Sequence, residues 1–286
     1  MKCWICASER LNAFKASNLP AALKPEDFRI TDSHYGRTGA LVRCAACGFI
    51  QTTENFSALG FYEQMDDEGY EETRGERSVQ FRRLLERLRR WAPSGRLLDI
   101  GAGSGALVEE ALKLGFKAEG VEPSGWLADR AKKRGLPVHH CALPHASVRG
   151  PFDVVTLVDV IEHVMDPMAL ISAAAGVLAP DGMILVITPD VSSVVPRLLG
   201  RRWWHFRIAH VGYFNPSNLD RAFLTHGFVP ADFYRPAWHF PVQYLFERTK
   251  RYLPIPRKWK LPDVIGGRTI PLNLLDSMAV LYRRKK

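Results

Sequence analysis

The chain has 286 residues, of which 47% are hydrophobic, so it can bury one sizeable core and a smaller one beside it. Because it has no apolar run of about 18 residues and no apolar stretch behind its first residues, we expect neither a transmembrane helix nor a signal peptide, and we expect its five cysteines to be thiols or metal ligands in the cytoplasm. The net charge of +9 is concentrated in residues 191–286, which hold 17 Lys/Arg and 5 Asp/Glu. Such a basic part could bind an acidic substrate, nucleic acid or a membrane surface; the alternative is a solvated basic face with no specific partner.

Two Cys-x-x-Cys pairs mark residues 1–51, which we interpret as a zinc-binding module. The four thiolates of one closed tetrahedral site would come from Cys3, Cys6, Cys44 and Cys47. The 37 residues between the pairs exceed the commonest spacing, but the cost of closing a loop grows slowly with its length. Such a site has no open position, so the zinc would be structural and would fold a segment poor in core residues. Scattered buried cysteines are the alternative, and Cys141 has no partner in this scheme.

Residues 52–95 are interpreted as a connector that ends in a helix. Phe81, Leu84, Leu85 and Leu88 recur at helical spacing and are flanked by arginines, which is typical of an amphipathic helix. The turn sequence Pro93–Gly95 ends this helix.

From residue 96 onward the sequence alternates between strands and helices. The expected strands are 97–100, one that ends at Val121, 152–158 and 183–188, and the expected helices carry 107–112, 126–131 and 168–178. The apolar run over 152–158 is of the kind that flanking helices bury on both faces. This alternation predicts an α/β fold with a doubly wound, mostly parallel sheet.

The most informative segment is the glycine-rich loop after the first of these strands. Gly101, Gly103 and Gly105 allow a sharp turn and a close approach of the backbone to a bound nucleoside, although the loop also fits the relaxed dinucleotide pattern G-x-G-x-x-G/A. Asp99 disfavours a dinucleotide, because a carboxylate beside the ligand repels a pyrophosphate and attracts ammonium and sulfonium charges. Glu122, at the end of the next strand, can accept hydrogen bonds from both ribose hydroxyls. The alternative is that both acids only cap loops.

Residues 96–236 resemble the class I S-adenosylmethionine-dependent methyltransferases in the glycine loop, in Gly120–Ser124, in Phe152–Val155 with Glu162–Val164, and in the Leu178–Gly182 turn. The resemblance implies a Rossmann-like domain over 96–286 with a seven-stranded sheet. It implies S-adenosyl-L-methionine as cofactor, with His140 and the two residues after it flanking the adenine, although the Asp that the family often has there is missing. The cofactor-binding residues would be Asp99, Gly101, Gly103, Gly105, Glu122, Pro123, Cys141, Ala142 and Asp159.

Methyl transfer from a sulfonium needs an aligned acceptor, exclusion of water and, for some acceptors, a base. Our candidates are His210, in an aromatic segment after the fifth strand, and His163, after the fourth. For His210 the alternative is a core histidine bonded to backbone. The sequence Asp159-x-x-Glu162-His163 is similar to the Glu-x-x-Glu-His of ubiquinone-pathway O-methyltransferases, which implies a divalent cation; the alternative is a structural turn. Trp203 and its neighbour would wall the acceptor site.

Residues 237–270 interrupt the alternation with aromatic, proline and basic residues, and 270–282 would form the last strand. The composition of this insertion suits a cap over the substrate cleft, a lipid headgroup layer, an acidic glycan or stacked nucleobases.

The N-terminal part is similar to the zinc module of sugar C-methyltransferases in the sequence 44–51 and in a stretch with Tyr62 and Tyr70. We therefore expect a methyltransferase that acts at oxygen or carbon of a small-molecule, sugar or glycan-linked acceptor. The alternatives are metal-assisted O-methylation of a phenolic or quinone-like acceptor and an RNA-directed or RNA-binding protein. Nucleic acid is disfavoured because residues 1–51 hold seven Lys/Arg against four Asp/Glu. Peripheral membrane contact and the oligomeric state stay open.

Overall fold

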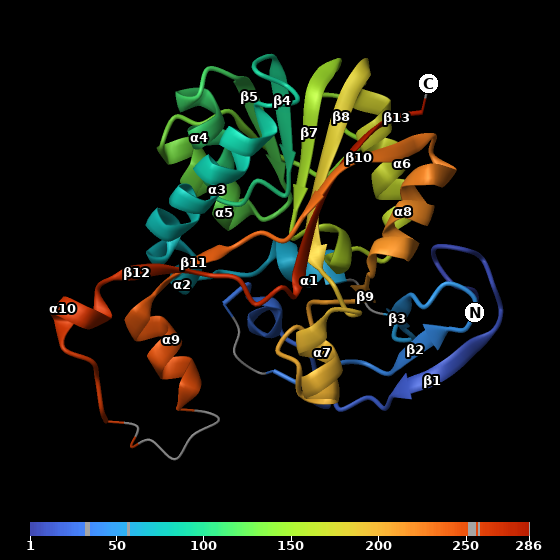
Figure 1. Cartoon of the computed structure of the whole chain (residues 1–286), viewed down its shortest axis with the longest axis vertical. Coiled ribbons are helices and arrows are strands. Elements are labelled where there is room, and N and C mark those ends of the chain that lie inside the picture. The colour runs from blue at the N-terminus through green and yellow to red at the C-terminus, as the bar shows by residue number, and fades with distance from the viewer. Residues whose placement is uncertain (32–34, 56–57, 251–255, 257, 286) are drawn as a thin grey trace.

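The computed structural model describes residues 1–31, 35–55, 58–250, 256 and 258–285 (Figure 1). The first part of the chain contains β1 (Leu11–Lys15), the 3-10 helix η1 (Pro25–Phe28), β2 (Leu41–Cys44), β3 (Ile50–Thr52), α1 (Ala58–Glu63), α2 (Glu68–Glu72) and α3 (Arg74–Leu88). No helix in these described ranges combines the length and the apolar character that a membrane span needs.

A seven-stranded sheet in the order β10-β13-β8-β7-β4-β5-β6 forms the larger part of the molecule. Its strands are β4 (Arg96–Ile100), β5 (Lys117–Glu122), β6 (Val138–His140), β7 (Phe152–Val158), β8 (Leu178–Pro189), β10 (Phe228–Tyr234) and β13 (Ser277–Arg284). Strands β4 to β8 run parallel, whereas β13 is antiparallel to both of its neighbours. The predicted doubly wound, mostly parallel sheet is confirmed.

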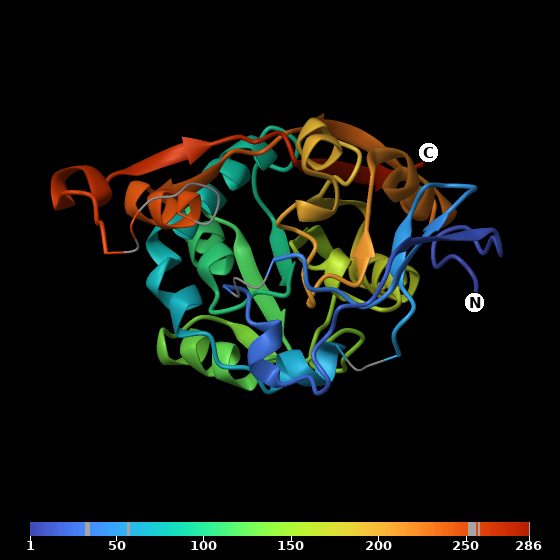
Figure 2. The same cartoon turned by 90° about the horizontal axis from the view of Figure 1, so that it is seen from below.

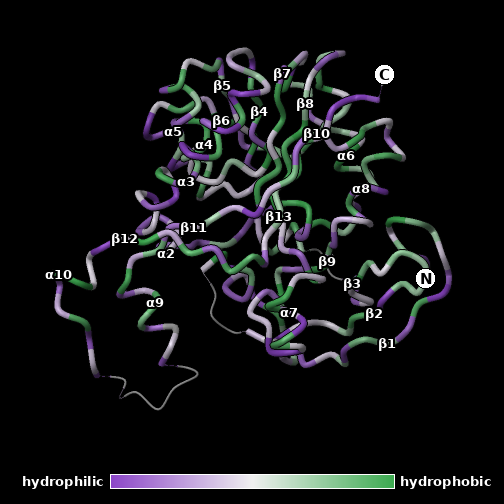
Figure 3. Tube along the Cα trace, viewed as in Figure 1, coloured by the Kyte–Doolittle hydropathy of each residue, from purple (hydrophilic) through white to green (hydrophobic). Residues whose placement is uncertain are grey.

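Helices cover both faces of the sheet because the central strands are apolar on both sides. On one face α3 and α4 (Ala106–Lys113) contribute Leu85 and Leu107 to a core with the sheet residues Leu97 and Val154. The other face packs against α6 (Pro167–Val177) and α8 (Pro216–Thr225). Helix α5 (Gly125–Lys133) packs against β5 and β6, and Figure 3 shows the hydrophobic stretches along the central strands.

Two expectations for the later strands need correction. The strand expected at 183–188 is longer, because β8 already starts at Leu178. The single strand expected over 270–282 is two strands, β12 (Thr269–Leu272) and β13. They are separated because Asn273 Oδ1 accepts a hydrogen bond from the Leu275 amide, and Leu275 has a φ of +58°, which no strand accommodates.

The N-terminal cysteine-rich part forms a second sheet in the order β1-β2-β3-β9. Its last strand, β9 (Gly212–Tyr213), lies in the sequence between β8 and β10 of the main sheet. It pairs with Ile50 and Gln51 of β3. Figure 1 shows β9 between the two parts. The small sheet is therefore completed by the larger domain and does not stand alone.

The insertion predicted at 237–270 is an extension at one side of the molecule. It contains β11 (Trp238–Pro241), α9 (Val242–Thr249), α10 (Asp263–Gly266) and β12, and β11 pairs with β12 in an antiparallel hairpin. Residues 251–255 and 257 of the insertion lie outside the described residues. Strand β11 packs against α3, and α9 and α10 project away from the sheet in Figures 1 and 2.

Candidate active site and cysteine centre

The glycine loop lies where β4 gives way to α4. Gly101, Gly103 and Gly105 all have positive φ, between +54° and +81°. A Cβ at Gly101 would approach a side-chain methyl of Val160 to 2.6 Å, and one at Gly103 would approach the Tyr70 hydroxyl to 2.6 Å. Both conformation and space therefore require glycine at these positions.

The two acids predicted at the strand ends are buried beside this loop. Glu122 accepts hydrogen bonds at 2.7 Å from the amides of both Gly103 and Ser124, and Asp99 accepts one at 2.6 Å from the Thr156 hydroxyl. Burial raises the pKa of Asp99 and of Glu122 to about 7. Glu122 therefore caps the glycine loop and the turn after β5 through these two amide hydrogen bonds, as the loop-capping alternative expects. The same carboxylate can still accept hydrogen bonds from a ligand.

Asp159 lies at the end of β7 in the left-handed region, with a φ of +52°. Desolvation by the residues packed around it, and then the charge of Asp276, raises the pKa of Asp159 to about 7, although its side chain still reaches solvent. Three neighbouring strands therefore each carry a carboxylate at or just after their carboxyl end: Asp99 and Glu122 are buried, whereas the Asp159 side chain is exposed. A cluster of this kind favours a ligand that brings positive charge or hydroxyl donors, as S-adenosylmethionine does.

Two tyrosines from the segment interpreted as a connector cover the same loop. Tyr62 of α1 hydrogen-bonds to Glu122, and the Tyr70 hydroxyl lies against Gly103. The guanidinium of Arg77 stacks at 3.4 Å from the Tyr70 ring centre. The sequence indicates both tyrosines only through a resemblance, and the structure places them beside the glycine loop and Glu122.

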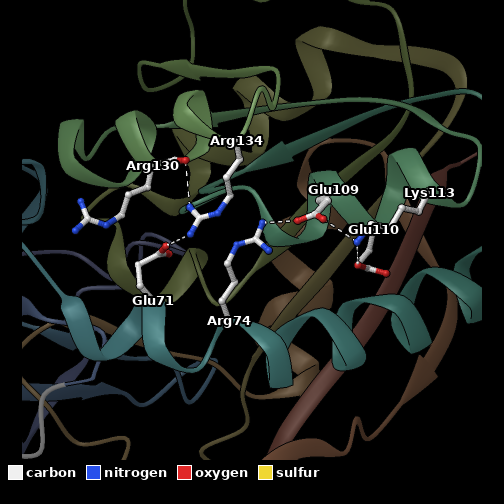
Figure 4. Close-up of polar contacts among 7 residues, drawn as sticks. All are labelled: Glu71, Arg74, Glu109, Glu110, Lys113, Arg130 and Arg134. Atoms are coloured by element: carbon white, nitrogen blue, oxygen red, sulfur yellow. Dashed lines mark hydrogen bonds and ion pairs between the residues drawn. The ribbon is translucent and has the colours of Figure 1, made fainter.

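Ion pairs hold this tyrosine-bearing segment against the cofactor domain (Figure 4). Glu71 of α2 pairs with Arg134 at the end of α5, and Arg74 of α3 pairs with Glu109 of α4 at 2.7 Å. Desolvation alone would raise the pKa of Glu71, but hydrogen bonds from Ser104 and Arg134 stabilise its ionised form more strongly, so that the pKa of Glu71 is lowered. The α1–α2 segment is thus fixed over the loop from two sides.

The residues predicted beside the adenine follow β6 as expected. The Cys141 amide donates to the Glu122 carbonyl at 3.1 Å, and a His140 ring nitrogen lies 3.1 Å from the carbonyl oxygen of Pro123. Cys141 and Ala142 are therefore close to Glu122 and Pro123. Their contact with adenine stays a prediction.

His163 and His210, 47 positions apart in the sequence, meet with their ring centres 4.7 Å apart. Together with Glu162 each offers one metal-binding atom within 4.8 Å of the others, whereas Asp159, expected in this group, is not part of it. The His163 Nδ1–H donates to the Ala209 carbonyl at 2.8 Å, which leaves its Nε2 lone pair available. Burial lowers the pKa of His163 to about 4 and lowers that of His210 as well.

Two further atoms of this group lack partners among the described residues: Glu162 Oε1 and His210 Nδ1. Glu162 is 1% exposed and His210 is 6% exposed. The other oxygen of Glu162 accepts from the Thr188 hydroxyl at 2.9 Å, and His210 bonds to the backbone of His205. His210 is therefore partly a core histidine, because one ring nitrogen bonds to backbone. Its Nδ1, however, has no partner among the described residues and belongs to the group with Glu162 and His163.

The tryptophan wall predicted for the acceptor site is wrong for Trp203. Its side chain is fully buried in a core with Leu41 and Ile50 of the small sheet, and its Nε1–H donates to Asp276 at 3.1 Å. His205 Nε2 lies 3.6 Å from the same Asp276 carboxylate. Sequence reasoning does not find Asp276, because the pattern over 270–282 predicts a single strand with Asp276 in its middle.

The four predicted cysteines come together in one cluster. Cys3 Sγ lies 3.6 Å from Cys47 Sγ, and Cys6 Sγ lies 3.5 Å from Cys44 Sγ. These distances exclude disulfides, and all four sulfurs lie within 4.8 Å of one another. Four thiolates about 2.3 Å from a single zinc stand about 3.8 Å apart, so the cluster fits a tetrahedral site.

Comparison with known proteins agrees with this geometry. A methyltransferase-domain family matches residues 73–231, more than half of the chain. The ubiquinone biosynthesis O-methyltransferase of Rhodopseudomonas palustris (strain HaA2) is 35% identical over 123 residues, 41% of this chain and 45% of that protein. The enzyme of the same name from Caulobacter sp. (strain K31) is 39% identical over 101 residues, 32% of this chain and 40% of that protein. The matches thus span less than half the length of these curated relatives.

Solved structures share the fold. A magnesium protoporphyrin IX methyltransferase from Synechocystis PCC 6803 with bound S-adenosylhomocysteine has a TM-score of 0.50 at 13% identity, over 79% of this chain and 91% of that one. The 1,6-didemethyltoxoflavin-N1-methyltransferase of Burkholderia thailandensis also has a TM-score of 0.50, at 14% identity over 90% of this chain and 99% of that one. With the glycine loop, the strand-end carboxylates and the family match, the chain belongs to the class I S-adenosylmethionine-dependent methyltransferases.

Proposed function

We propose that this enzyme methylates a hydroxyl oxygen of a phenolic or quinone-like acceptor. The observation that carries the proposal is the set of unsatisfied lone pairs at Glu162, His163 and His210, which is suited to take up a hydroxyl proton. The similarity to ubiquinone-pathway O-methyltransferases supports oxygen as the methylated atom.

When bound, S-adenosylmethionine supplies a methyl group on a positively charged sulfur. In the transfer the acceptor oxygen would bond to the methyl carbon as the carbon–sulfur bond breaks, and His210 Nδ1 would take up the hydroxyl proton. Because burial lowers the pKa of His210, its ring is neutral at pH 7 and its lone pair is free. His163 and Glu162 orient the same hydroxyl, and Asp159 holds the methionine part of the cofactor.

A divalent cation at the same three residues is the second arrangement that we propose. Two imidazoles and one carboxylate are a common ligand set for cations with open positions. A hydroxyl bound to such a cation loses its proton more readily, and the histidines would then act as ligands in place of a base. For the four cysteines we propose a structural zinc, because their distances fit one tetrahedral ion.

A sugar or glycan-linked hydroxyl is the second candidate acceptor. It is supported by the cysteine cluster, through the likeness of the N-terminal sequence to the zinc module of sugar C-methyltransferases. The lone-pair cluster would serve either acceptor, so the choice rests on substrate tests.

The test compares turnover of S-adenosylmethionine with an ortho-dihydroxybenzoate and with a nucleoside diphosphate sugar. We expect O-methylated benzoate by mass spectrometry, and turnover of the sugar alone would contradict the proposal. Chelation is then followed by metal analysis of the protein. Loss of turnover with full retention of zinc, reversed by added Mg²⁺ or Mn²⁺, supports the cation arrangement, and unchanged turnover supports the base.

A further inference from the structure

A groove lies on the other side of α3 from the site just described, under the β11–β12 hairpin. It encloses about 280 Å³. One wall is a single face of α3, and the other comes from the two strands of the hairpin. Its lining residues are Gly75, Glu76, Val79, Arg83, His239, Thr269 and Pro271.

The floor of the groove contains polar atoms that lack hydrogen-bond partners among the described residues. His239 is 7% exposed, and both of its ring nitrogens are unpartnered. Gln80 is not part of the lining but contacts His239: it is 6% exposed, its Oε1 accepts from the His239 amide at 3.4 Å, and its Nε2 has no acceptor among the described residues. An imidazole always carries at least one N–H, so the lining holds at least one buried donor without an acceptor, at His239. Such groups are rare without a ligand or ordered water.

The positive charge of Arg83, next to His239, also favours an anion in the groove. Burial first, and the charge of Arg83 second, lower the pKa of His239. A bound anion would reverse the effect of Arg83 on the pKa of His239 and give the buried His239 N–H an acceptor. Glu76, the other charged residue of the lining, is two helical turns from Arg83, about 10 Å along the axis. The anion therefore fits at the Arg83 end, and Glu76 favours a ligand whose far end carries a hydroxyl or an ammonium group.

We propose that this groove is a second ligand site, in which Arg83 and His239 bind a phosphate-type oxyanion. It is separate from the methyl-transfer site and does not depend on the proposed acceptor. The oxyanion can belong to a soluble phosphate ester or to a phospholipid headgroup, since the chemistry of recognition is the same.

Nuclear magnetic resonance of the histidine rings tests the proposal directly. The His239 signal is assigned by its loss in His239→Gln, and inorganic phosphate is added at constant ionic strength against a chloride control. We expect a saturable shift of this signal and a rise of its titration midpoint when phosphate is bound. Arg83→Gln should weaken binding at least about tenfold, the usual effect of losing one charge-assisted hydrogen bond. The matched control Arg90→Gln, which removes an exposed arginine beyond the end of the same helix, should change nothing.

A second arm separates the two sources of the oxyanion. Sedimentation with phosphatidylcholine vesicles that contain phosphatidylglycerol should depend on Arg83, but not on Arg90, if the ligand is a headgroup. Competition by glycerol phosphate without any vesicle binding identifies a soluble ester. No phosphate-specific shift, or an equal shift in Arg83→Gln and the unchanged protein, would overturn the site.

Discussion

At the scale of single residues, the buried carboxylates beside the glycine loop should make cofactor binding depend on pH. Burial raises the pKa of Asp99 and Glu122 to about 7, so both are partly protonated in the free protein at neutral pH. The ammonium, the sulfonium and the ribose hydroxyls of S-adenosylmethionine all favour the ionised forms. Cofactor affinity should therefore fall as the pH drops through 7.

Calorimetry at pH 8, 7 and 6 checks this, with an expected loss of up to tenfold per pH unit for each acid once the pH is below its pKa. Asp99→Asn should bind more weakly at pH 8 and show a shallower pH dependence. An affinity for S-adenosylmethionine that is flat between pH 8 and 6 would show that these carboxylates do not face the cofactor.

The two histidines that meet in the lone-pair cluster carry the second residue-scale prediction. His210→Ala should lower turnover by about 10²–10⁴-fold, the usual range for losing general-base assistance. Cofactor affinity should hardly change, because the glycine loop and Glu122 do not contact His210. His226→Ala is the matched control, since that ring bonds to the Ala222 carbonyl at the end of α8.

The comparison with His163→Ala decides between the two arrangements. A larger loss in His163→Ala than in His210→Ala moves the principal role to the Glu162–His163 side and favours the cation. If neither substitution slows turnover by more than a few-fold, the enzyme works by alignment alone and no base is present.

At the scale of elements, the long strands and helices were predictable and the short ones were not. The apolar run over 152–158 and the glycines after 97–100 determine β7, β4 and the loop by local chemistry. Helices α1 and α2 span six and five residues and have no apolar period; α2 is held by an ion pair to the end of α5, and the start of α3 that follows it is held by an ion pair to α4.

The candidate site was predictable to the same extent. Strand-end acids follow from the alternation of strands and helices, so Asp99 and Glu122 could be found. The meeting of His163 with His210 depends on a long-range chain path, as does the burial of Trp203 under the small sheet. An aromatic residue near a site cannot be told from a core residue by its neighbours in sequence.

The pairing of β3 with β9 leads to a prediction about the cysteine centre. Cys44→Ser should remove the metal and melt the small sheet, because that sheet has little core of its own. His210 lies just before β9, so turnover should fall as well, while cofactor binding at the glycine loop is kept. Metal analysis, thermal melting and calorimetry check the three parts. Cys141→Ser, outside the cluster, should keep its zinc, and a Cys44→Ser protein with normal melting would contradict a structural site.

At the scale of the whole molecule, α3 connects parts that are far apart in the sequence. Its Leu85 is fully buried against the sheet, and its Arg87 makes two 3.0 Å hydrogen bonds to Asp232 of β10. The β11 strand of the extension packs against α3 as well. The N-terminal end of α3 is fixed to α4 by the ion pair between Arg74 and Glu109. The tyrosine-bearing α1–α2 segment, the main sheet and the proposed phosphate-type groove therefore all contact or adjoin α3.

Leu85→Ala should destabilise the protein by about 2–5 kcal/mol, the usual cost of removing a fully buried leucine side chain. Because α3 supports both sites, the same substitution should weaken S-adenosylmethionine and phosphate binding together, even at temperatures where the protein is folded. Leu112→Ala on α4, where the side chain is 40% exposed, is the matched control and should cost well under 1 kcal/mol. Urea unfolding gives the stabilities, and calorimetry gives the two affinities. A large loss of stability with both affinities intact would mean that α3 holds the core together but does not couple the two sites.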